Sequence, residues 1–305
     1  MSRYRRAAAL ALLLAALAAA GCGLGPGSGV GSVSLTVSRD YGAERLEAPL
    51  SEEAAESDTV MRVLDRNADI STRYGGGFVQ SIDGLSAATH GGDRFDWFFY
   101  VNGVESPVGA ADFSLHGGEA IWWDYRDWSA ASRVPAVVGS WPEPFVHGYE
   151  GEAHRVEVVC EGGGMACGLV RSRLKAAGAS PATGRSGEIR VLVGPWARLR
   201  RDPSAAQLQG GPQVSGVFGE FVRLGGGYRL RGLDEGGEPS HDFGPEAGLV
   251  AATRRYEAPP VWLVTGATAA AVRAAAGLLD AADLRDHYAV ATEAGRETPL
   301  PVRRP

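Results

Sequence analysis

The densest group of side chains able to form a binding surface is aromatic. Five of the seven tryptophans lie within 45 residues, from Trp97 to Trp141. Large flat rings with a hydrogen-bonding tip suit a flat conjugated ligand edged with amides. The ligand-binding residues predicted from this region are Phe98, Tyr100, Asn102, Trp122, Trp123, Tyr125 and Trp128. The alternative is that these aromatics form a hydrophobic core or a contact with the second half of the chain.

Two of the three cysteines are candidates for a disulfide. Cys160 and Cys167 flank a glycine-rich stretch that is able to fold back on itself. An oxidising compartment favours a bond between them, and two buried thiols are the alternative. Without partnered histidines the pair does not form a zinc site. The six histidines are scattered without paired spacing, so no metal ligand is predicted.

The sequence contains none of the common catalytic motifs. It lacks a Gly-x-Ser-x-Gly elbow, a His-Glu-x-x-His zinc motif, a Walker loop and a Cys-x-x-Cys pair. Gly162 and Gly164 fit the start of a dinucleotide-binding fingerprint, but Cys167 stands where its third glycine belongs. We therefore predict no enzymatic activity and no required cofactor. An envelope hydrolase is an alternative that the motif search disfavours.

The N-terminus has the order of an export signal. Three arginines precede an Ala/Leu run over 7–20, which ends in small residues directly before Cys22. The run is shorter than the roughly 20 residues that a membrane-spanning helix needs. A cysteine here resembles the bacterial lipoprotein signal, in which the thiol is diacylated and the preceding peptide is removed. We expect a signal peptide over 1–21, a lipid on Cys22 and a Gly/Ser tether over 22–32. A transmembrane helix and a plain secretory signal are the alternatives.

The composition limits the partners. The net charge is −6, and removal of the three N-terminal arginines would bring it to about −9. This acidity argues against nucleic acid or an anionic membrane surface as a partner. With 45% hydrophobic residues, the chain is able to bury real cores, and its length suits about two domains. We expect an extracytoplasmic protein held at the membrane by its lipid.

Residues 33–128 are predicted to form the first domain. The expected elements are strands at 33–37, 46–50, 70–74, 78–82, 95–101 and 120–125, with a short amphipathic helix from Thr59. Asn102-Gly103 is a strong hairpin signal, because both residue types tolerate positive φ. Alternation along 95–101 places aromatic side chains on both faces of that strand. Two strands, a helix and further strands give the order of a β-grasp-like fold.

These elements resemble the transcobalamin-like C-terminal domain family. The residues that carry the resemblance are Thr59-Val60, Gly77-Phe78-Val79, Ile82-Asp83-Gly84, Trp97 to Gly103, Gly109 to Leu115 and Gly118 to Tyr125. In the animal cobalamin carriers this domain covers one face of the corrin ring, opposite a helical barrel domain. The resemblance therefore implies a ligand-binding module with a corrinoid, cobalamin, as the leading ligand. No helical barrel is predicted in this chain.

Residues 129–153 contain three prolines and are predicted to be a linker to a second domain over 154–305. The expected strands there are 155–160, 189–193, 217–224, 228–233, 261–264 and 288–292, and the expected helices are 166–177, 203–208 and 268–279. Residues 249–253 are left undecided, and the tail from Thr298 is expected to be loose. Strand-helix-strand order at both ends indicates an α/β sandwich. The predicted fold class is thus α+β, a β-grasp-like N-terminal domain followed by an α/β sandwich domain.

The predicted function combines the anchor with the aromatic cluster. We expect a lipoprotein that captures a corrinoid or similar small molecule and passes it to a membrane importer. A surface module that contacts a protein or a glycan is the alternative. The residues leave open which ligand is bound, what residues 154–305 do, and whether the two domains clamp one ligand.

Overall fold

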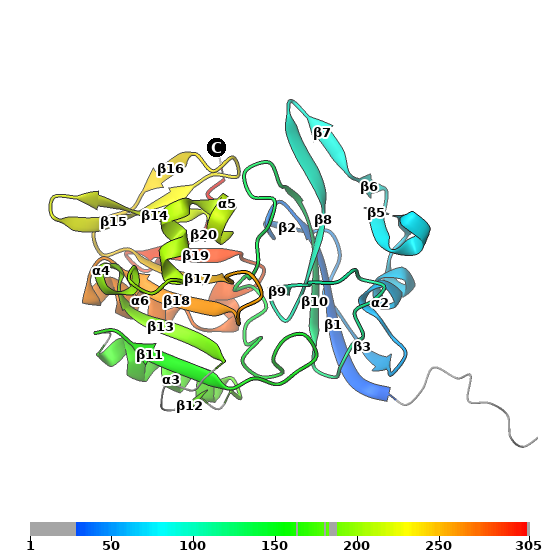
Figure 1. Ribbon diagram of the computed structural model, residues 1–305, viewed down its shortest axis with the longest axis horizontal. Helices are drawn as coiled ribbons and strands as arrows, with labels where there is room; N and C mark the ends of the chain where they lie inside the picture. The colour runs from blue at the N-terminus through cyan, green and yellow to red at the C-terminus, as the bar shows by residue number, and fades with distance from the viewer. Residues whose placement is uncertain (1–28, 163, 180, 183–187, 304–305) are drawn as a thin grey trace, which may run out of the picture.

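The structure, a computed structural model, describes residues 29–162, 164–179, 181–182 and 188–303. The predicted signal peptide, Cys22 and most of the predicted tether lie outside these residues. The described chain forms two bodies side by side (Figure 1). Its mixture of helices and several sheets confirms the predicted α+β class. No described helix is both long and apolar enough to cross a membrane.

The first domain is built on a mixed sheet. Its elements are β1 (Gly29–Arg39), β2 (Glu44–Arg45), β3 (Leu50–Ala55), α2 (Val60–Asn67), β4 (Ile70–Arg73), η1 (Tyr74–Gly76), β5 (Phe78–Ile82), β6 (Leu85–Ser86), β7 (Ala88–His90), β8 (Asp93–Val101), β9 (Val104–Glu105) and β10 (Ala120–Asp127). The parallel pair β1 and β10 lies at the centre, with β3 antiparallel to β1 and β8 antiparallel to β10. In a β-grasp sheet the first and the last strand are neighbours at the centre, as β1 and β10 are in this domain.

The helix α2 covers one face of this sheet. The Thr59 hydroxyl caps it by accepting a hydrogen bond from the backbone N–H of Arg62 at 3.3 Å. Val60, Val63 and Leu64 recur on one side of the helix and are fully buried. They join the inward side chains of the sheet in one hydrophobic core.

Two boundaries in the first domain differ from the predicted ones. The second long strand begins at Leu50 and not at Leu46, which lies in the turn after β2. The strand β1 begins at Gly29, inside the predicted tether, because its first residues pair with Ala54 and Ala55 of β3.

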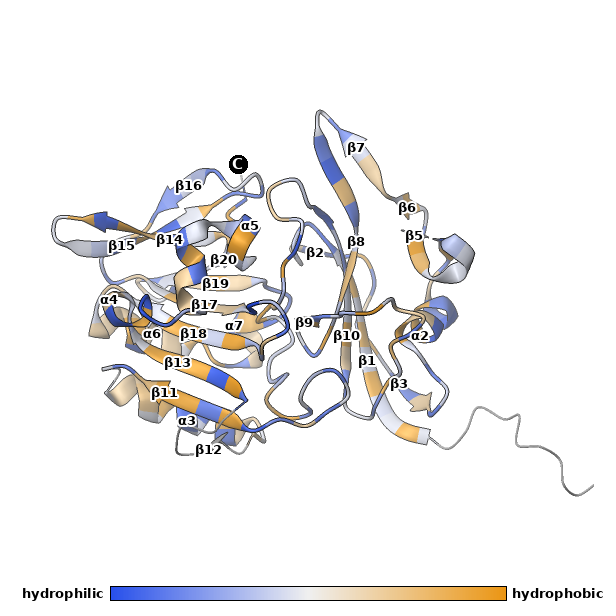
Figure 2. Cartoon of the chain, in the orientation of Figure 1, coloured by the Kyte–Doolittle hydropathy of each residue, from blue (hydrophilic) through white to orange (hydrophobic). Residues whose placement is uncertain are grey.

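The second domain contains a seven-stranded sheet in the order β12-β11-β13-β18-β17-β19-β20. Its elements are β11 (Val156–Cys160), α3 (Met165–Ala176), β12 (Pro181–Ala182), β13 (Ile189–Pro195), α4 (Trp196–Leu199), η2 (Ala205–Gly210), α5 (Pro212–Ser215), β14 (Gly219–Leu224), β15 (Gly227–Leu233), β16 (Pro239–Asp242), β17 (Gly248–Thr253), β18 (Val261–Gly266), α6 (Ala269–Gly277), α7 (Ala281–Leu284), β19 (Ala289–Glu293) and β20 (Arg296–Leu300). Helices α3 and α6 cover one face, and α4, η2 and the β14–β15 hairpin cover the other. Figure 2 shows the hydrophobic residues of β13 and β18 between these layers.

Several predictions for the second domain are decided by the structure. The disulfide Cys160–Cys167 is present, as predicted. The undecided residues 249–253 form β17, which is completely buried between β18 and β19. The prediction of a loose tail from Thr298 is wrong for its first residues, because β20 pairs with β19 and Leu300 is buried.

The segment 129–153 runs between the two domains (Figure 1) and contains no helix or long strand. It is nevertheless packed, since Val134, Val137 and Val138 are fully buried. The N–H of Val137 donates to the carbonyl of Gly103 in the first domain at 2.9 Å. The N–H of Val138 donates to the carbonyl of Tyr288 in the second domain at 3.2 Å. The proline-containing segment therefore binds to both domains.

Candidate functional site

The strands β8 and β10 place aromatic side chains on two opposite faces. Their register pairs Trp122 with Tyr100 and Trp123 with Phe99. Because successive side chains of a strand point to opposite faces, the two pairs separate. The pair of Phe99 and Trp123 packs in the core with α2, and the pair of Tyr100 and Trp122 packs against the second domain.

The face toward the second domain is closed around Tyr288. The ring of Tyr288 lies 5.4 Å from Trp122 and 5.7 Å from Tyr100, edge-on to both. A third ring, Tyr41 from the turn after β1, lies 5.1 Å away. All four side chains are at most 4% exposed. Edge-to-face contacts of this kind add to the burial of apolar area, so this face joins the two domains.

A buried polar network runs through the same contact. The hydroxyl of Tyr100 donates to that of Tyr288 at 3.3 Å, which donates to Asp124 Oδ2 at 2.9 Å. Asp124 Oδ1 accepts from the Ser38 hydroxyl at 2.6 Å and from the Gly42 N–H at 3.0 Å. Burial raises the pKa of Asp124 to about 6, although these hydrogen bonds act in the opposite direction.

A buried cation lies beside this network. The side chain of Arg126 is fully buried, and its guanidinium lies 3.8 Å from the centre of the Phe98 ring. One nitrogen, Nη1, donates to the carbonyl of Ala131 at 2.8 Å. Its Nε and Nη2 find no acceptor among the residues that the structure describes. The cation is held chiefly by an aromatic face and the connecting segment.

Three of the predicted ligand-binding residues are therefore inaccessible in this conformation. Tyr100 and Trp122 are occupied by the contact between the domains. Asn102 is fully buried in the β8–β9 turn with φ 53°, as the Asn-Gly signal requires. Its side chain donates to the carbonyl of Gly148 at 2.9 Å and accepts from the N–H of Ala120 at 2.8 Å.

Two more of the predicted residues lie near the projecting end of β8. Tyr125 is 7% exposed, stacks on Phe95 at 5.9 Å and donates to the carbonyl of Ser86 at 2.8 Å. Trp128 is half-buried, and the guanidinium of Arg94 lies 3.7 Å from the centre of its ring. Both rings thus have protein partners, and neither lines a pocket with the remaining predicted residues, Phe98 and Trp123.

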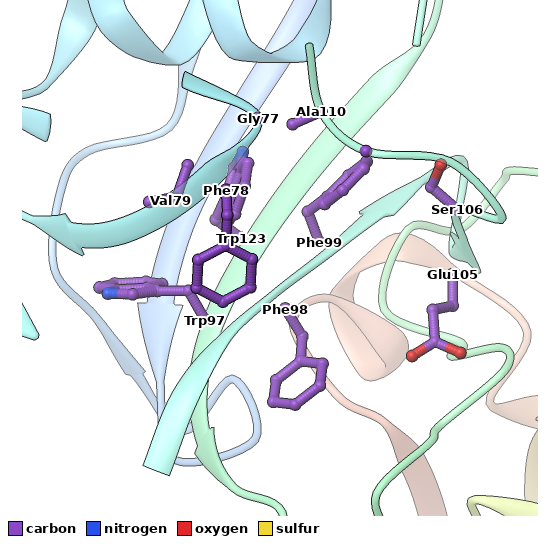
Figure 3. Close-up of a pocket in the computed structure, with 11 residues that line it drawn as sticks. Gly77, Phe78, Val79, Trp97, Phe98, Phe99, Glu105, Ser106, Ala110 and Trp123 are labelled. Carbon is purple, nitrogen blue, oxygen red and sulfur yellow. The ribbon is translucent and has the colours of Figure 1, made fainter. Parts of the chain in front are cut away.

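Phe98 and Trp123 both border a pocket of about 220 Å³ between β5, β8 and the loop after β9. Its lining residues are Gly77, Phe78, Val79, Trp97, Phe98, Phe99, Glu105, Ser106, Gly109, Ala110 and Trp123. In Figure 3 the side chains of Phe98 and Glu105 point to the opposite side of β8 from Phe99. The aromatic wall of the pocket is thus formed by Phe78, Trp97, Phe99 and Trp123.

Exposed apolar and aromatic side chains surround the mouth of this pocket. Phe78 is 40% exposed, and Val108, in the neighbouring loop, is 47% exposed. Tyr74, which meets Phe78 edge-on at 6.3 Å, is 87% exposed. Exposed apolar side chains grouped around a concavity are typical of interaction sites. The Nε1 of Trp123 is buried and donates to no acceptor in the described part of the chain.

The lining residues that were not among the predicted ligand-binding residues are Gly77, Phe78, Val79, Trp97, Phe99, Glu105, Ser106, Gly109 and Ala110. All of these except Glu105 and Ser106 belong to the motifs that carry the family resemblance. Phe99 lies on the opposite face of the strand from Phe98 and Tyr100, which were predicted to bind the ligand. Strand alternation separates the two faces of β8, but it does not predict which face lines the pocket. That depends on which face the second domain covers.

The described residues contain no group of three His, Cys, Asp or Glu side chains that is able to hold a metal ion. The pocket in the first domain is lined by rings and small residues, because the carboxylate of Glu105 points to the other side of β8. Its chemistry is therefore suited to apolar and aromatic ligand groups.

Comparison with known proteins gives one family match. Residues 57–127 match the model of a domain of unknown function, DUF4430. The match runs from the start of α2 to the end of β10 and so includes every residue of the pocket. It is consistent with the transcobalamin-like resemblance of this region. No curated protein matches the chain.

Among solved structures, a protein from Ruminococcus gnavus, for which metal binding has been suggested, is 15% identical to this chain. The alignment covers 32% of this chain and 97% of that one, with a TM-score of 0.24. Likeness at this level carries no conclusion about ligands.

Proposed function

We propose that the first domain binds a small molecule with a flat apolar part in the pocket between β5 and β8. The observation that carries the proposal is the aromatic wall of Phe78, Trp97, Phe99 and Trp123, which opens to solvent beside exposed apolar side chains. An apolar cavity with few polar groups is the usual form of a small-molecule site.

A corrinoid is the leading ligand, on the strength of the transcobalamin-like resemblance. Its macrocycle is larger than the pocket of about 220 Å³, so only one edge or one substituent would enter. The rest of the ring would lie across Phe78 and Val108, where the surface is apolar.

Equilibrium dialysis against cyanocobalamin tests this proposal, because the absorbance of the ligand reports the bound fraction directly. We expect saturable binding to the purified chain and a loss of at least about tenfold in affinity in Phe78→Ala, since an aromatic contact of this size contributes more than about 1.4 kcal/mol. Tyr256→Ala is the matched control, because Tyr256 is 75% exposed on the second domain. Absence of binding up to high micromolar concentration would reject the corrinoid.

A surface module for a glycan or a protein is the second candidate. Tyr74 and Phe78 lie on one hairpin and present rings to solvent at a pocket mouth. Such rings stack readily on the apolar faces of sugars. This candidate would be favoured over the first if the protein binds envelope glycan, if Tyr74→Ala loses that binding, and if equilibrium dialysis detects no binding of cyanocobalamin.

We further propose that the protein is a lipoprotein exposed outside the cytoplasmic membrane and that it delivers its ligand to an importer. The support is the signal-peptide pattern before Cys22, in which arginines, an apolar run and small residues follow one another, and the glycine-rich stretch after it. Cys22→Ser should move the protein from the detergent phase to the aqueous phase in Triton X-114 partitioning and abolish labelling by a fatty-acid analogue. Unchanged partitioning would show that another segment holds the protein at the membrane.

A further inference from the structure

In the parallel part of the second sheet, the chain places the strands that follow β11 on both sides of it. The strand β12 pairs with β11 on one side, and β13 pairs with it on the other, all in parallel. The chain leaves β11 through α3, whose Val170 and Leu174 pack on one face of the sheet. It leaves β13 through α4, whose Trp196 and Leu199 pack on the opposite face (Figure 1). Connections that leave neighbouring parallel strands on opposite faces open a crevice at the carboxyl ends of those strands, and ligands of open α/β sheets bind there.

The structure has a cavity of about 750 Å³ at this point. Its walls come from the end of β11, from β13 and from the chain after β13. The lining residues are Val159, Glu161, Leu192, Ala197, Arg198, Leu199, Arg201, Asp202 and Pro203. Val159 and Leu192 are register partners on the same face of the sheet, and with Leu199 they form an apolar floor. The charged side chains stand around it.

The charges of this cavity are not balanced within the protein. Asp202 is satisfied, because Arg190 Nη1 donates to it at 2.5 Å and the N–H of Ser204 at 2.8 Å. Arg198 and Arg201 are exposed and form no ion pair with the residues that the structure describes. Two guanidinium groups beside an apolar floor therefore remain available for an anion.

The side chain of Arg198 lies against the loop after β11. A Cβ atom on Gly162 would lie 2.7 Å from Arg198 Nη1, and Gly162 has φ +78°. Glycine adopts this positive φ without strain and leaves room for the guanidinium beside it. Glu161, the residue before it, also lines the cavity and is exposed. Its carboxylate is an acceptor that hydroxyl groups of a ligand would satisfy.

We propose that this crevice binds a small phosphorylated molecule that carries neighbouring hydroxyl groups, such as a nucleoside monophosphate. Arg198 and Arg201 bind the phosphate, Glu161 accepts from the hydroxyls, and the apolar part lies on Val159, Leu192 and Leu199. The site belongs to the second domain and shares no residue with the pocket of the first domain. It is thus independent of the function proposed above.

Isothermal titration calorimetry of the full chain with AMP and with adenosine tests the proposal. We expect AMP to bind with submillimolar affinity and adenosine at least tenfold more weakly. The double variant Arg198→Gln/Arg201→Gln should lose at least tenfold in AMP affinity while binding adenosine as before. Glu161→Gln should weaken the binding of AMP and of adenosine by a similar factor, because both carry the hydroxyl groups that Glu161 is proposed to bind.

The matched control is Arg223→Gln, because Arg223 is an exposed arginine on β14 outside the cavity. AMP affinity should be unchanged in this variant. Absence of AMP binding at millimolar concentration would overturn the proposal. Equal affinity for AMP and adenosine would overturn it as well. So would an equal loss of AMP affinity in Arg223→Gln and in the double variant, because the arginines of the crevice would then not bind the phosphate.

Discussion

Both faces of the β8–β10 pair carry aromatic side chains, but these side chains have different surroundings on the two faces. One face presents Tyr100 and Trp122, which are buried against Tyr288 of the second domain. The other presents Phe99 and Trp123, which pack near α2 and also line a pocket open to solvent. The same residue types thus form a contact between the domains on one side and a candidate binding site on the other.

The difference lies in what covers each face. The second domain and the segment 129–153 cover the Trp122 face completely and supply hydrogen-bond partners for its polar tips. The Trp123 face is covered by one short helix and a hairpin, which leave a gap beside Phe78. Aromatic composition alone therefore does not distinguish a domain contact from a ligand site. Four variants probe this comparison, in order of decreasing expected effect.

Trp122→Ala should have the largest effect on stability. The side chain is 3% exposed, packs against two tyrosines, and donates from Nε1 to the Ser38 hydroxyl at 2.8 Å. Truncation of a buried tryptophan costs about 3–5 kcal/mol, measured as the free energy of unfolding in urea. Trp128→Ala is the control from the same cluster, since its half-buried ring contacts Arg94 near the surface, and it should lose only about 1 kcal/mol.

Asp124→Asn should change the pH dependence of the domain contact. Because burial raises the pKa of Asp124 to about 6, above its unfolded value of about 3.9, the folded state holds the proton more tightly. The free energy of unfolding contributed by this group then falls as pH rises from below about 4 to above about 6, by about 3 kcal/mol in total. The asparagine variant lacks this contribution. Urea unfolding of both proteins from pH 4 to pH 7 measures it, and parallel curves would contradict the burial of an ionisable group.

Tyr100→Phe tests the polar side of the contact with a smaller change. It removes the hydroxyl that donates to Tyr288 at 3.3 Å, while Tyr288 keeps its bond to Asp124. No buried group is left unpaired, so the loss should be about 1 kcal/mol in the free energy of unfolding. A loss as large as that of Trp122→Ala would mean that the network, and not the ring packing, holds the domains together.

Phe78→Ala should have the smallest effect on stability and the clearest effect on binding. Its side chain is 40% exposed at the pocket mouth, so the free energy of unfolding should fall by less than about 1 kcal/mol. The loss of cyanocobalamin binding expected above would then separate binding from stability. A cost comparable to that of Trp122→Ala would place Phe78 in the core and remove the contrast between the two faces.

Much of the fold was predictable from local sequence patterns. Thr59 followed by an apolar spacing of three and four marks α2, and Asn102-Gly103 marks the turn after β8. The glycine-rich stretch between Cys160 and Cys167 predicted their disulfide. These features depend on interactions between residues close in the chain, so local physics determines them. The predicted lipid on Cys22 likewise rests on neighbouring residues and stays a prediction.

The face of β8 that is free to bind, by contrast, was decided only by the tertiary structure. Alternation assigns Tyr100 and Phe99 to opposite faces but does not say which face the second domain will cover. That choice depends on Tyr288, 188 residues away from Tyr100 in the chain. The pairing of β20 with β19, where a loose tail was expected, has the same origin. Burial of a side chain depends on the segments folded against it, and residues so far apart give no local signal of their contact.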